Sequence, residues 1–167
     1  SATEQSPDYV VLETRLLRLS SEPLEFYAWP DGQRPDCWVA PGRKDTSNGK
    51  GYVALWEIAD STLFLKAVDS YVPLPLEPAM IENGKHLGPR WQHLTLGQLF
   101  PGKVVRGRVL ASWYSGVLVI PLGEPLEHEG PHGTLHEREV VLHVERGQVV
   151  KREMRVNSIP MGAPQAP

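Results

Sequence analysis

The sequence predicts a mostly β protein, a single antiparallel β domain of about seven strands with one or two short helices. A sandwich, a curled sheet and a partly open barrel all fit this prediction. Short apolar segments alternate with turn residues along most of the chain, and no repeat of 20–50 residues is visible. The chain has 15 Gly and 16 Pro among 167 residues, well above their average combined usage of roughly 12%. Such frequent chain reversals favour strands over long helices.

The length is that of about one domain, which we place at residues 9–159. Residues 1–8 and the Pro-rich tail 160–167 are polar and carry little apolar area. Because that area does not offset the entropy of ordering the backbone, both ends are expected to be flexible.

The first expected elements are a strand, a short helix and a long loop. Residues 9–19 (YVVLETRLLRL) begin with β-branched residues, which favours a strand, although the apolar positions also recur at helical spacing. The segment 21–23 (SEP) is typical of a helix start, so a short helix is expected through Trp29. Residues 30–50 show no period, and loops of this length in compact domains are often functional or disordered.

The clearest element is a hairpin of residues 51–58 (GYVALWEI) and 62–68 (TLFLKAV), joined by a turn. Both faces of its first strand are largely apolar, which is typical of a strand covered on both sides. After a Pro- and Gly-rich connection, residues 95–100 (TLGQLF) fit one helical turn capped by Thr95.

Two more hairpins are expected in the C-terminal half. One joins residues 103–113 to 116–122, and the other joins 134–145 to 148–157 through Arg146-Gly147, where glycine supplies a positive φ. In the last hairpin apolar and charged residues alternate, which predicts one buried and one solvated face. The apolar face of its first strand is formed by Val140, Leu142 and Val144.

Composition excludes several classes of protein. The formal net charge of −3 excludes a broadly basic nucleic-acid binder. A single cysteine, Cys37, excludes an internal disulfide framework and a cysteine-based zinc cluster. No apolar run approaches the ~20 residues that span a bilayer. The first residues lack the basic and apolar order of a signal peptide, so a cytoplasmic location is expected.

Residues 51–157 contain a GY…WEI strand, a short turn, an L-x-L strand, a W-(F/Y)-S-G…I-P-x-G segment, a glutamate-containing segment and a closing hairpin, in that order. This order resembles that of a family of small bacterial proteins without an established activity. The resemblance implies a bacterial cytosolic protein and no specific chemistry. Members of the family usually have aromatic residues at the positions that His132 and His136 occupy in this chain. The matching residues are Gly51, Tyr52, Trp56, Glu57, Ile58, Leu63, Leu65, Trp113, Ser115, Gly116, Ile120, Pro121, Gly123, Leu126, Glu127, Gly133 and Glu137.

Three histidines at a spacing of four, His128, His132 and His136, are the candidate metal ligands. Three imidazoles with an open position could hold zinc and activate water, with Glu127 or Glu137 as base. Gly130-Pro131 and Gly133 interrupt any continuous helix, so the imidazoles would converge only through a bent loop. The alternative is that these histidines are exposed residues of a loop and an edge strand with no metal-binding role, and this interpretation is favoured.

Carboxylates offer a second candidate chemistry. Glu124, Glu127, Glu129, Glu137 and Glu139 lie close in sequence, and two of them could act as acid and base if one were desolvated. Charged faces of antiparallel strands are the more ordinary explanation.

Glu57 interrupts an apolar strand, so it either marks the end of that strand or is buried. A buried carboxylate needs a charge partner or a raised pKa, and Arg106 and Arg108 are possible partners. An ion pair on the sheet is favoured over catalysis.

Phosphate-loop and G-x-S-x-G signatures are absent, and no signature places a histidine beside Cys37.

Aromatic and basic residues gather between positions 26 and 44. They could stack on single-stranded nucleic acid, or they could form a small additional core beneath the long loop. The additional core is the favoured interpretation. If this segment binds, a protein partner is expected, because Trp, Tyr and Arg dominate interface hot spots. The candidate contact residues are Tyr27, Trp29, Arg34, Trp38 and Arg43.

The sequence therefore predicts a non-catalytic, cytoplasmic bacterial protein that binds a protein partner, resembling an immunity protein or an adaptor. It is expected to act as a monomer or homodimer, without a cofactor and without binding nucleic acid or membrane. Two alternatives stay open: a zinc-dependent hydrolase at residues 127–139, and a small-ligand carrier with a pocket inside the sheet.

Overall fold

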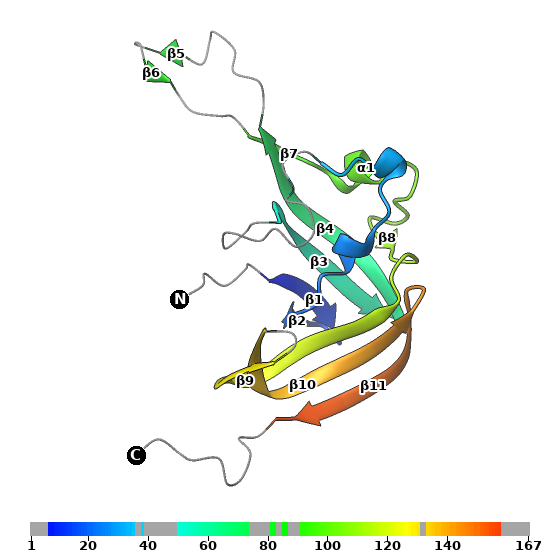
Figure 1. Cartoon of the computed structure of the whole chain (residues 1–167). Helices are drawn as coiled ribbons and strands as arrows, with labels where there is room; N and C mark the ends of the chain where they lie inside the picture. Colours follow the sequence, from blue (N-terminus) through cyan, green and yellow to red (C-terminus); the bar gives the residue numbers. More distant parts are fainter. Residues whose placement is uncertain are drawn as a thin grey trace.

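The computed structural model describes residues 7–35, 38, 50–73, 81–82, 85–86, 91–130 and 133–157 (Figure 1). It confirms the mostly β prediction, because the described residues form a large mixed sheet that is not closed into a barrel, beside a small antiparallel pair of strands at residues 81–82 and 85–86. No helix in the described part is long and apolar enough to cross a membrane. In chain order the elements are β1 (Asp8–Leu12), β2 (Arg15–Leu19), η1 (Pro23–Phe26), η2 (Pro30–Gly32), β3 (Tyr52–Ala59), β4 (Thr62–Pro73), β5 (Ile81–Glu82), β6 (Lys85–His86), β7 (Trp91–His93), α1 (Leu96–Leu99), β8 (Val109–Leu110), β9 (Gly116–Gly130), β10 (Gly133–Glu145) and β11 (Gln148–Val156).

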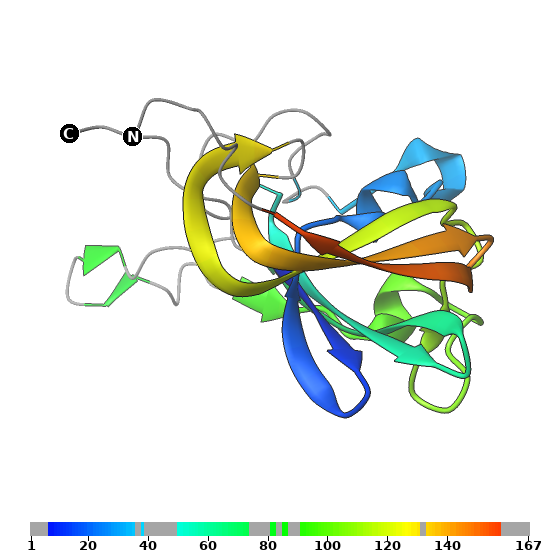
Figure 2. The same ribbon diagram turned by 90° about the horizontal axis from the view of Figure 1, so that it is seen from below.

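The sheet runs in the order β2-β1-β3-β4-β11-β10-β9, and the short strands β7 and β8 also pair with β4. All pairs are antiparallel except β1 and β3, which are parallel. The two ends of this order come together, because the Ser20 N–H donates to the Val119 carbonyl (2.9 Å) and Ser21 Oγ accepts from the Val119 N–H (3.0 Å). The sheet is therefore strongly curled, as Figure 2 shows for β9 and β10.

The N-terminal segment folds as a hairpin where one strand was expected. Glu13 and Thr14 form its turn with φ values of 51° and 66°, and β1 and β2 pair on either side. The short helix expected through Trp29 is a 3-10 turn that ends at Phe26, with a second 3-10 turn at Pro30–Gly32. The predicted flexible ends lie mainly outside the described residues, which begin at Pro7, and Asp8 already belongs to β1.

The central hairpin, the C-terminal hairpin and the helical turn are confirmed. β3 pairs with β4 and β10 with β11, both antiparallel. At α1 the Gln98 N–H donates to Thr95 Oγ1 (3.3 Å) and the Thr95 N–H donates to Gln98 Oε1 (2.9 Å), which completes a capping box. The side chains of Val140, Leu142 and Val144 are buried as expected.

The hairpin predicted between residues 103–113 and 116–122 is wrong. Only Val109–Leu110 of the first segment forms a strand, and that strand pairs with β4. Arg106 and Gly107 have φ values of 52° and 76°, so the chain reverses within the segment. β9 pairs with β10 instead and continues to Gly130.

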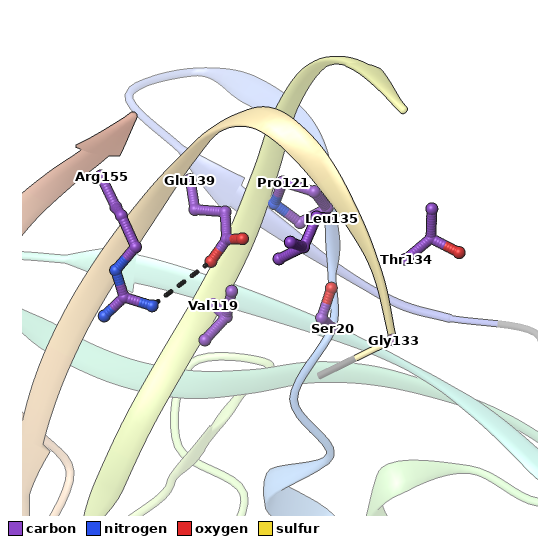
Figure 3. A pocket seen from close by; sticks show the side chains of 8 residues that line it. All are labelled: Ser20, Val119, Pro121, Gly133, Thr134, Leu135, Glu139 and Arg155. Atoms are coloured by element: carbon purple, nitrogen blue, oxygen red, sulfur yellow. Dashed lines mark ion pairs between the residues drawn. The ribbon is translucent and has the colours of Figure 1, made fainter. Parts of the chain in front are cut away.

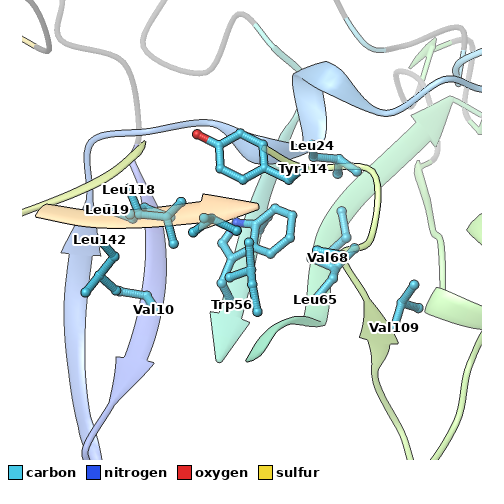
Figure 4. Packing of buried hydrophobic residues seen from close by; sticks show 14 of the residues in the cluster. Val10, Leu19, Leu24, Trp56, Leu65, Val68, Val109, Tyr114, Leu118 and Leu142 are labelled. Atoms are coloured by element: carbon cyan, nitrogen blue, oxygen red, sulfur yellow. The ribbon is translucent and has the colours of Figure 1, made fainter. Parts of the chain in front are cut away.

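The hydrophobic core fills the inner side of the curled sheet (Figure 4). Trp56 and Tyr52 of β3 are its largest fully buried apolar side chains. Side chains of the described residues pack against one another in this interior. The labelled core residues in Figure 4 are Val10, Leu19, Leu24, Trp56, Leu65, Val68, Val109, Tyr114, Leu118 and Leu142.

Candidate functional site

Three aromatic residues predicted to contact a partner, Tyr27, Trp29 and Trp38, lie together near η1 and η2. The Tyr27 ring meets the rings of Trp29, Trp113 and Phe100 edge-on, at centroid distances of 4.7, 4.9 and 5.1 Å. Trp38 lies 5.3 Å from Trp29 and is buried. Each such contact contributes about 0.5–1.5 kcal/mol beyond the area that it buries, so these rings extend the core, as the additional-core interpretation expects.

Arg34, the fourth predicted contact residue described, joins this cluster through polar contacts. Its Nη2 donates to Glu25 Oε2 (3.0 Å), and the Tyr52 hydroxyl donates to the same oxygen (3.0 Å). Burial raises the pKa of Tyr52, so this hydroxyl stays a donor. The guanidinium also lies 5.8 Å from the Trp38 ring centroid. Arg43 lies outside the described residues, and a binding role for these five residues stays a prediction.

A fully buried ion pair lies next to this cluster. Lys50 Nζ donates to Asp8 Oδ1 (2.5 Å), and neither side chain is exposed. Asp8 also accepts from the Ala54 N–H and from Trp56 Nε1, both at 3.1 Å, while the Lys50 ammonium lies 4.9 Å from the Tyr52 ring centroid. Burial raises the pKa of Asp8, and the Lys50 charge opposes that effect. Neither residue lines a cavity described below, so we assign the pair a structural role.

Glu57 forms the ion pair expected for it. Arg108 Nη1 donates to Glu57 Oε1 (2.6 Å), and Lys66 Nζ donates to Oε2 (3.3 Å). The hydrogen bond from Arg108 lowers the pKa of Glu57, with a further contribution from Lys66. The Arg108 guanidinium also lies 3.6 Å from the Phe64 ring centroid. Both oxygens of this carboxylate accept a hydrogen bond from a basic side chain, which supports the structural interpretation.

The proposed zinc ligands are only partly described. His128 is exposed on β9, and His136 is half-buried on β10 with its Nδ1 3.2 Å from the Thr134 carbonyl. His132 and Cys37 lie outside the described residues. Within the described ranges no group of three or more His, Cys, Asp or Glu side chains is placed to hold a metal ion.

A small cavity lies where the curled β9–β10 ribbon meets the chain after β2 (Figure 3). Glu139 lines it and is buried, unlike the other four carboxylates considered for acid–base chemistry. Its Oε1 accepts from Asn157 Nδ2 (2.7 Å), and Oε2 lies 3.7 Å from Arg155 Nη1. The cavity volume is about 20 Å³, which is room for about one water molecule. Glu139 is therefore a buried carboxylate beside a cavity of about the size of one water molecule. The lining residues are Ser20, Val119, Pro121, Gly133, Thr134, Leu135, Glu139 and Arg155.

The outer face of β1, β3 and β4 carries a larger groove. Its volume is about 280 Å³, and apolar atoms form almost all of its lining. Val53 and Leu55 are the β3 side chains that point outward, opposite to the buried Tyr52, Ala54 and Trp56. The lining residues are Tyr9, Leu16, Val53, Ala54, Leu55, Ala67 and Asp69.

The groove residues were missed as a site, although the sequence contained a signal for them. An apolar second face on β3 indicated a strand covered on both sides. In the structure Val53 and Leu55 are half-buried, and Leu16 beside them is 64% exposed. The expected cover is therefore incomplete among the described residues.

Comparisons with known proteins give no match: no family model, no curated protein and no solved structure is similar to this chain. The fold and its surfaces define the chain as a mostly β protein with an open, curled sheet and an apolar groove on its outer face.

Proposed function

We propose that this protein is a non-catalytic binding protein that holds a segment of another protein in the groove on the outer face of β1, β3 and β4. The observation that supports the proposal is the apolar second face of β3, which stays half exposed. Exposed apolar surface rimmed by polar residues is a feature of protein–protein interaction sites. Catalysis has less support, because the buried Glu139 carboxylate faces a cavity of about 20 Å³.

The dimensions of the groove indicate its occupant. A volume of about 280 Å³ is slightly below the roughly 300–1,000 Å³ typical of small-molecule sites. It is suited to one or two large apolar side chains of a partner. Leu16 at the rim is an exposed apolar side chain that such a partner would cover.

The charge beside the groove specifies the partner further. Arg18 pairs with Tyr9 across β1 and β2, so it lies on the groove side of the hairpin, and it is exposed. Among the described residues no ion pair involves Arg18. A complementary partner segment carries an apolar anchor with a carboxylate next to it, positioned toward Arg18.

The test compares three variants in affinity capture from an extract of the native host. Leu16→Asp places a charge in the groove, Arg18→Glu reverses the neighbouring charge, and Val105→Asp alters a side chain of similar exposure (67%) away from the groove. We expect a partner that wild type and Val105→Asp retain and that Leu16→Asp and Arg18→Glu lose. The purified partner should then bind Leu16→Asp at least about tenfold more weakly, as expected for a hot-spot residue. Capture of the same proteins by all four forms would refute the proposal.

A further inference from the structure

The strand β11 has one unpaired edge. Its first residues contact β4, where Gln148 pairs with Thr62 and the Val149 N–H donates to the Ser61 carbonyl (2.8 Å). Beyond Val149 no described strand pairs with this side of β11, which is the outermost strand in Figure 1. An edge of this kind is a template for pairing with another chain.

The pairing of β11 with β10 determines which residues of β11 direct their backbone N–H and C=O groups outward from this edge. The Asn157 N–H donates to the Glu137 carbonyl of β10 (2.9 Å). Because backbone groups alternate in direction along a strand, those of Arg152, Met154 and Val156 point away from β10. The bulge of this hairpin lies between His143 and Val144, so the pairing from Lys151 to Val156 is regular.

The edge also exposes apolar side chains that a solvated edge strand ordinarily avoids. Met154 is 54% exposed and Val156 is 73% exposed. Glu153 and Arg155 lie on the opposite face of the strand, since successive side chains alternate between faces. Within the same copy Glu153 contacts His143 and Lys151, and Arg155 Nη1 lies 3.7 Å from Glu139 Oε2, yet both side chains stay partly exposed. An occupant must therefore cover apolar side chains on one face and match charges of both signs on the other.

A second copy of β11 meets both requirements in one antiparallel register. With Met154 opposite Met154, each Glu153 lies opposite an Arg155, and each Val156 lies opposite the aliphatic stem of an Arg152. Lys151 lies opposite Asn157. This arrangement forms about six backbone hydrogen bonds between the strands and uses only residues beyond the contact with β4.

The neighbouring registers are unfavourable because they oppose like charges. Centring the pair on Glu153 places Glu153 opposite Glu153 and Lys151 opposite Arg155. Centring it on Arg152 places two arginines face to face and requires the part of β11 that already contacts β4. Like charges directly opposite each other destabilise a strand pair, so the register centred on Met154 is favoured.

We propose that two copies of this protein associate through β11 in that register, forming a twofold dimer with a sheet that continues from one copy into the other. A twofold contact uses the same edge on both copies and closes on itself. The dimer therefore covers the exposed edge without leading to open-ended aggregation. The groove of the proposed function lies on other strands and is independent of this contact.

Sedimentation velocity of the full chain, from low micromolar to several hundred micromolar protein, tests the dimer. We expect a concentration-dependent dimer for wild type. Met154→Lys should abolish it, because two ammonium groups would then lie opposite each other. Val105→Lys is the matched control at an exposed site elsewhere and should leave it unchanged. A monomeric wild type at the highest concentration, or a dimer that Met154→Lys leaves intact, would overturn the proposal.

Charge reversal tests the register. Glu153→Arg or Arg155→Glu alone creates two like-charge pairs and should raise the dimer Kd about tenfold. The double variant restores opposite charges and should return the Kd to within about threefold of wild type. Val105→Glu, a charge change at an exposed site elsewhere, should have little effect. Thermal unfolding of each variant confirms that it is folded, and a double variant as weak as the single ones would refute the register.

Discussion

Replacing Lys50 by methionine should destabilise the fold severely. The substitution keeps an unbranched side chain of similar length but removes the ammonium group that contacts Asp8 Oδ1 (2.5 Å). Asp8 would keep only the donors of Ala54 and Trp56, both at 3.1 Å, and would stay fully buried. Removing one partner of a buried ion pair costs about 3–5 kcal/mol, because the remaining charge is uncompensated.

The cost should depend on pH with a definite sign. Burial already raises the pKa of Asp8 above its ordinary value of 3.8, and Lys50 opposes the rise. Without Lys50 the pKa rises further. A carboxyl group whose pKa is raised in the folded state stabilises that state when protonated, below its ordinary pKa. That stabilisation is lost as the pH rises through the folded value. The difference between wild type and Lys50→Met should therefore be larger at about pH 8 than at about pH 5.

Urea unfolding followed by tryptophan fluorescence measures these differences. Lys66→Met is the matched control, because Lys66 pairs with Glu57 at the surface and its side chain is 47% exposed. Exposed ion pairs contribute about 0–1 kcal/mol, so the control should lose no more than that. The double variant Asp8→Leu/Lys50→Met should recover only part of the lost stability, since neither charge remains but the Ala54 N–H and Trp56 Nε1 lose their acceptor. A loss below about 1 kcal/mol for Lys50→Met would refute the reasoning.

Two further predictions concern a turn and a surface ion pair. Gly147→Ala should cost about 2 kcal/mol or more, because its φ is 81° and the added Cβ would lie 2.8 Å from the Ala111 carbonyl oxygen. Gly102→Ala, with a φ of 76° and no atom within 4 Å, should cost about 1 kcal/mol, and equal losses in urea would contradict this account. Hydrogen bonding to His143 lowers the pKa of Glu153 from its ordinary 4.5 to about 2. Its contribution to stability should therefore be present above pH 4.5 and lost as the pH falls toward about 2, and an NMR titration that gives an ordinary pKa would contradict the hydrogen bond.

The sequence predicted those hairpins whose turns and alternation are both local signals. β3–β4 and β10–β11 have alternating strands and short connections, and both were found. The β1–β2 hairpin was missed because its turn residues, Glu13 and Thr14, are not typical of positive φ and occupy a segment that also has helical spacing. The partner of β8 was also missed, since pairing with β4 depends on where the chain returns after residues 91–100 and not on the β8 sequence.

The candidate sites were less predictable, because burial is a property of the assembled sheet. Aromatic composition identified Tyr27 and Trp29, but could not distinguish a packed cluster from an exposed contact surface. Glu139 and Val141 were expected on a solvated face, yet both are buried, because the curl of β9 and β10 closes over that face. The unpaired edge of β11 follows from the divergence of β11 and β4, which no local pattern encodes.

The buried ion pair and the outer groove depend on a single choice of register. β1 is parallel to β3, with Val10 opposite Trp56 and Tyr9 opposite Leu55. In this register Asp8 and Val10 point into the core and Tyr9 lines the groove. A slip of one residue would reverse every side chain of β1, placing Tyr9 inside and leaving Lys50 buried without its counter-ion. Burying Asp8 costs desolvation energy in the native register. A register shifted by one residue would lose both the Asp8–Lys50 ion pair and the apolar lining of the groove. The polar pair inside the sheet therefore stabilises the same register that forms the apolar groove outside it.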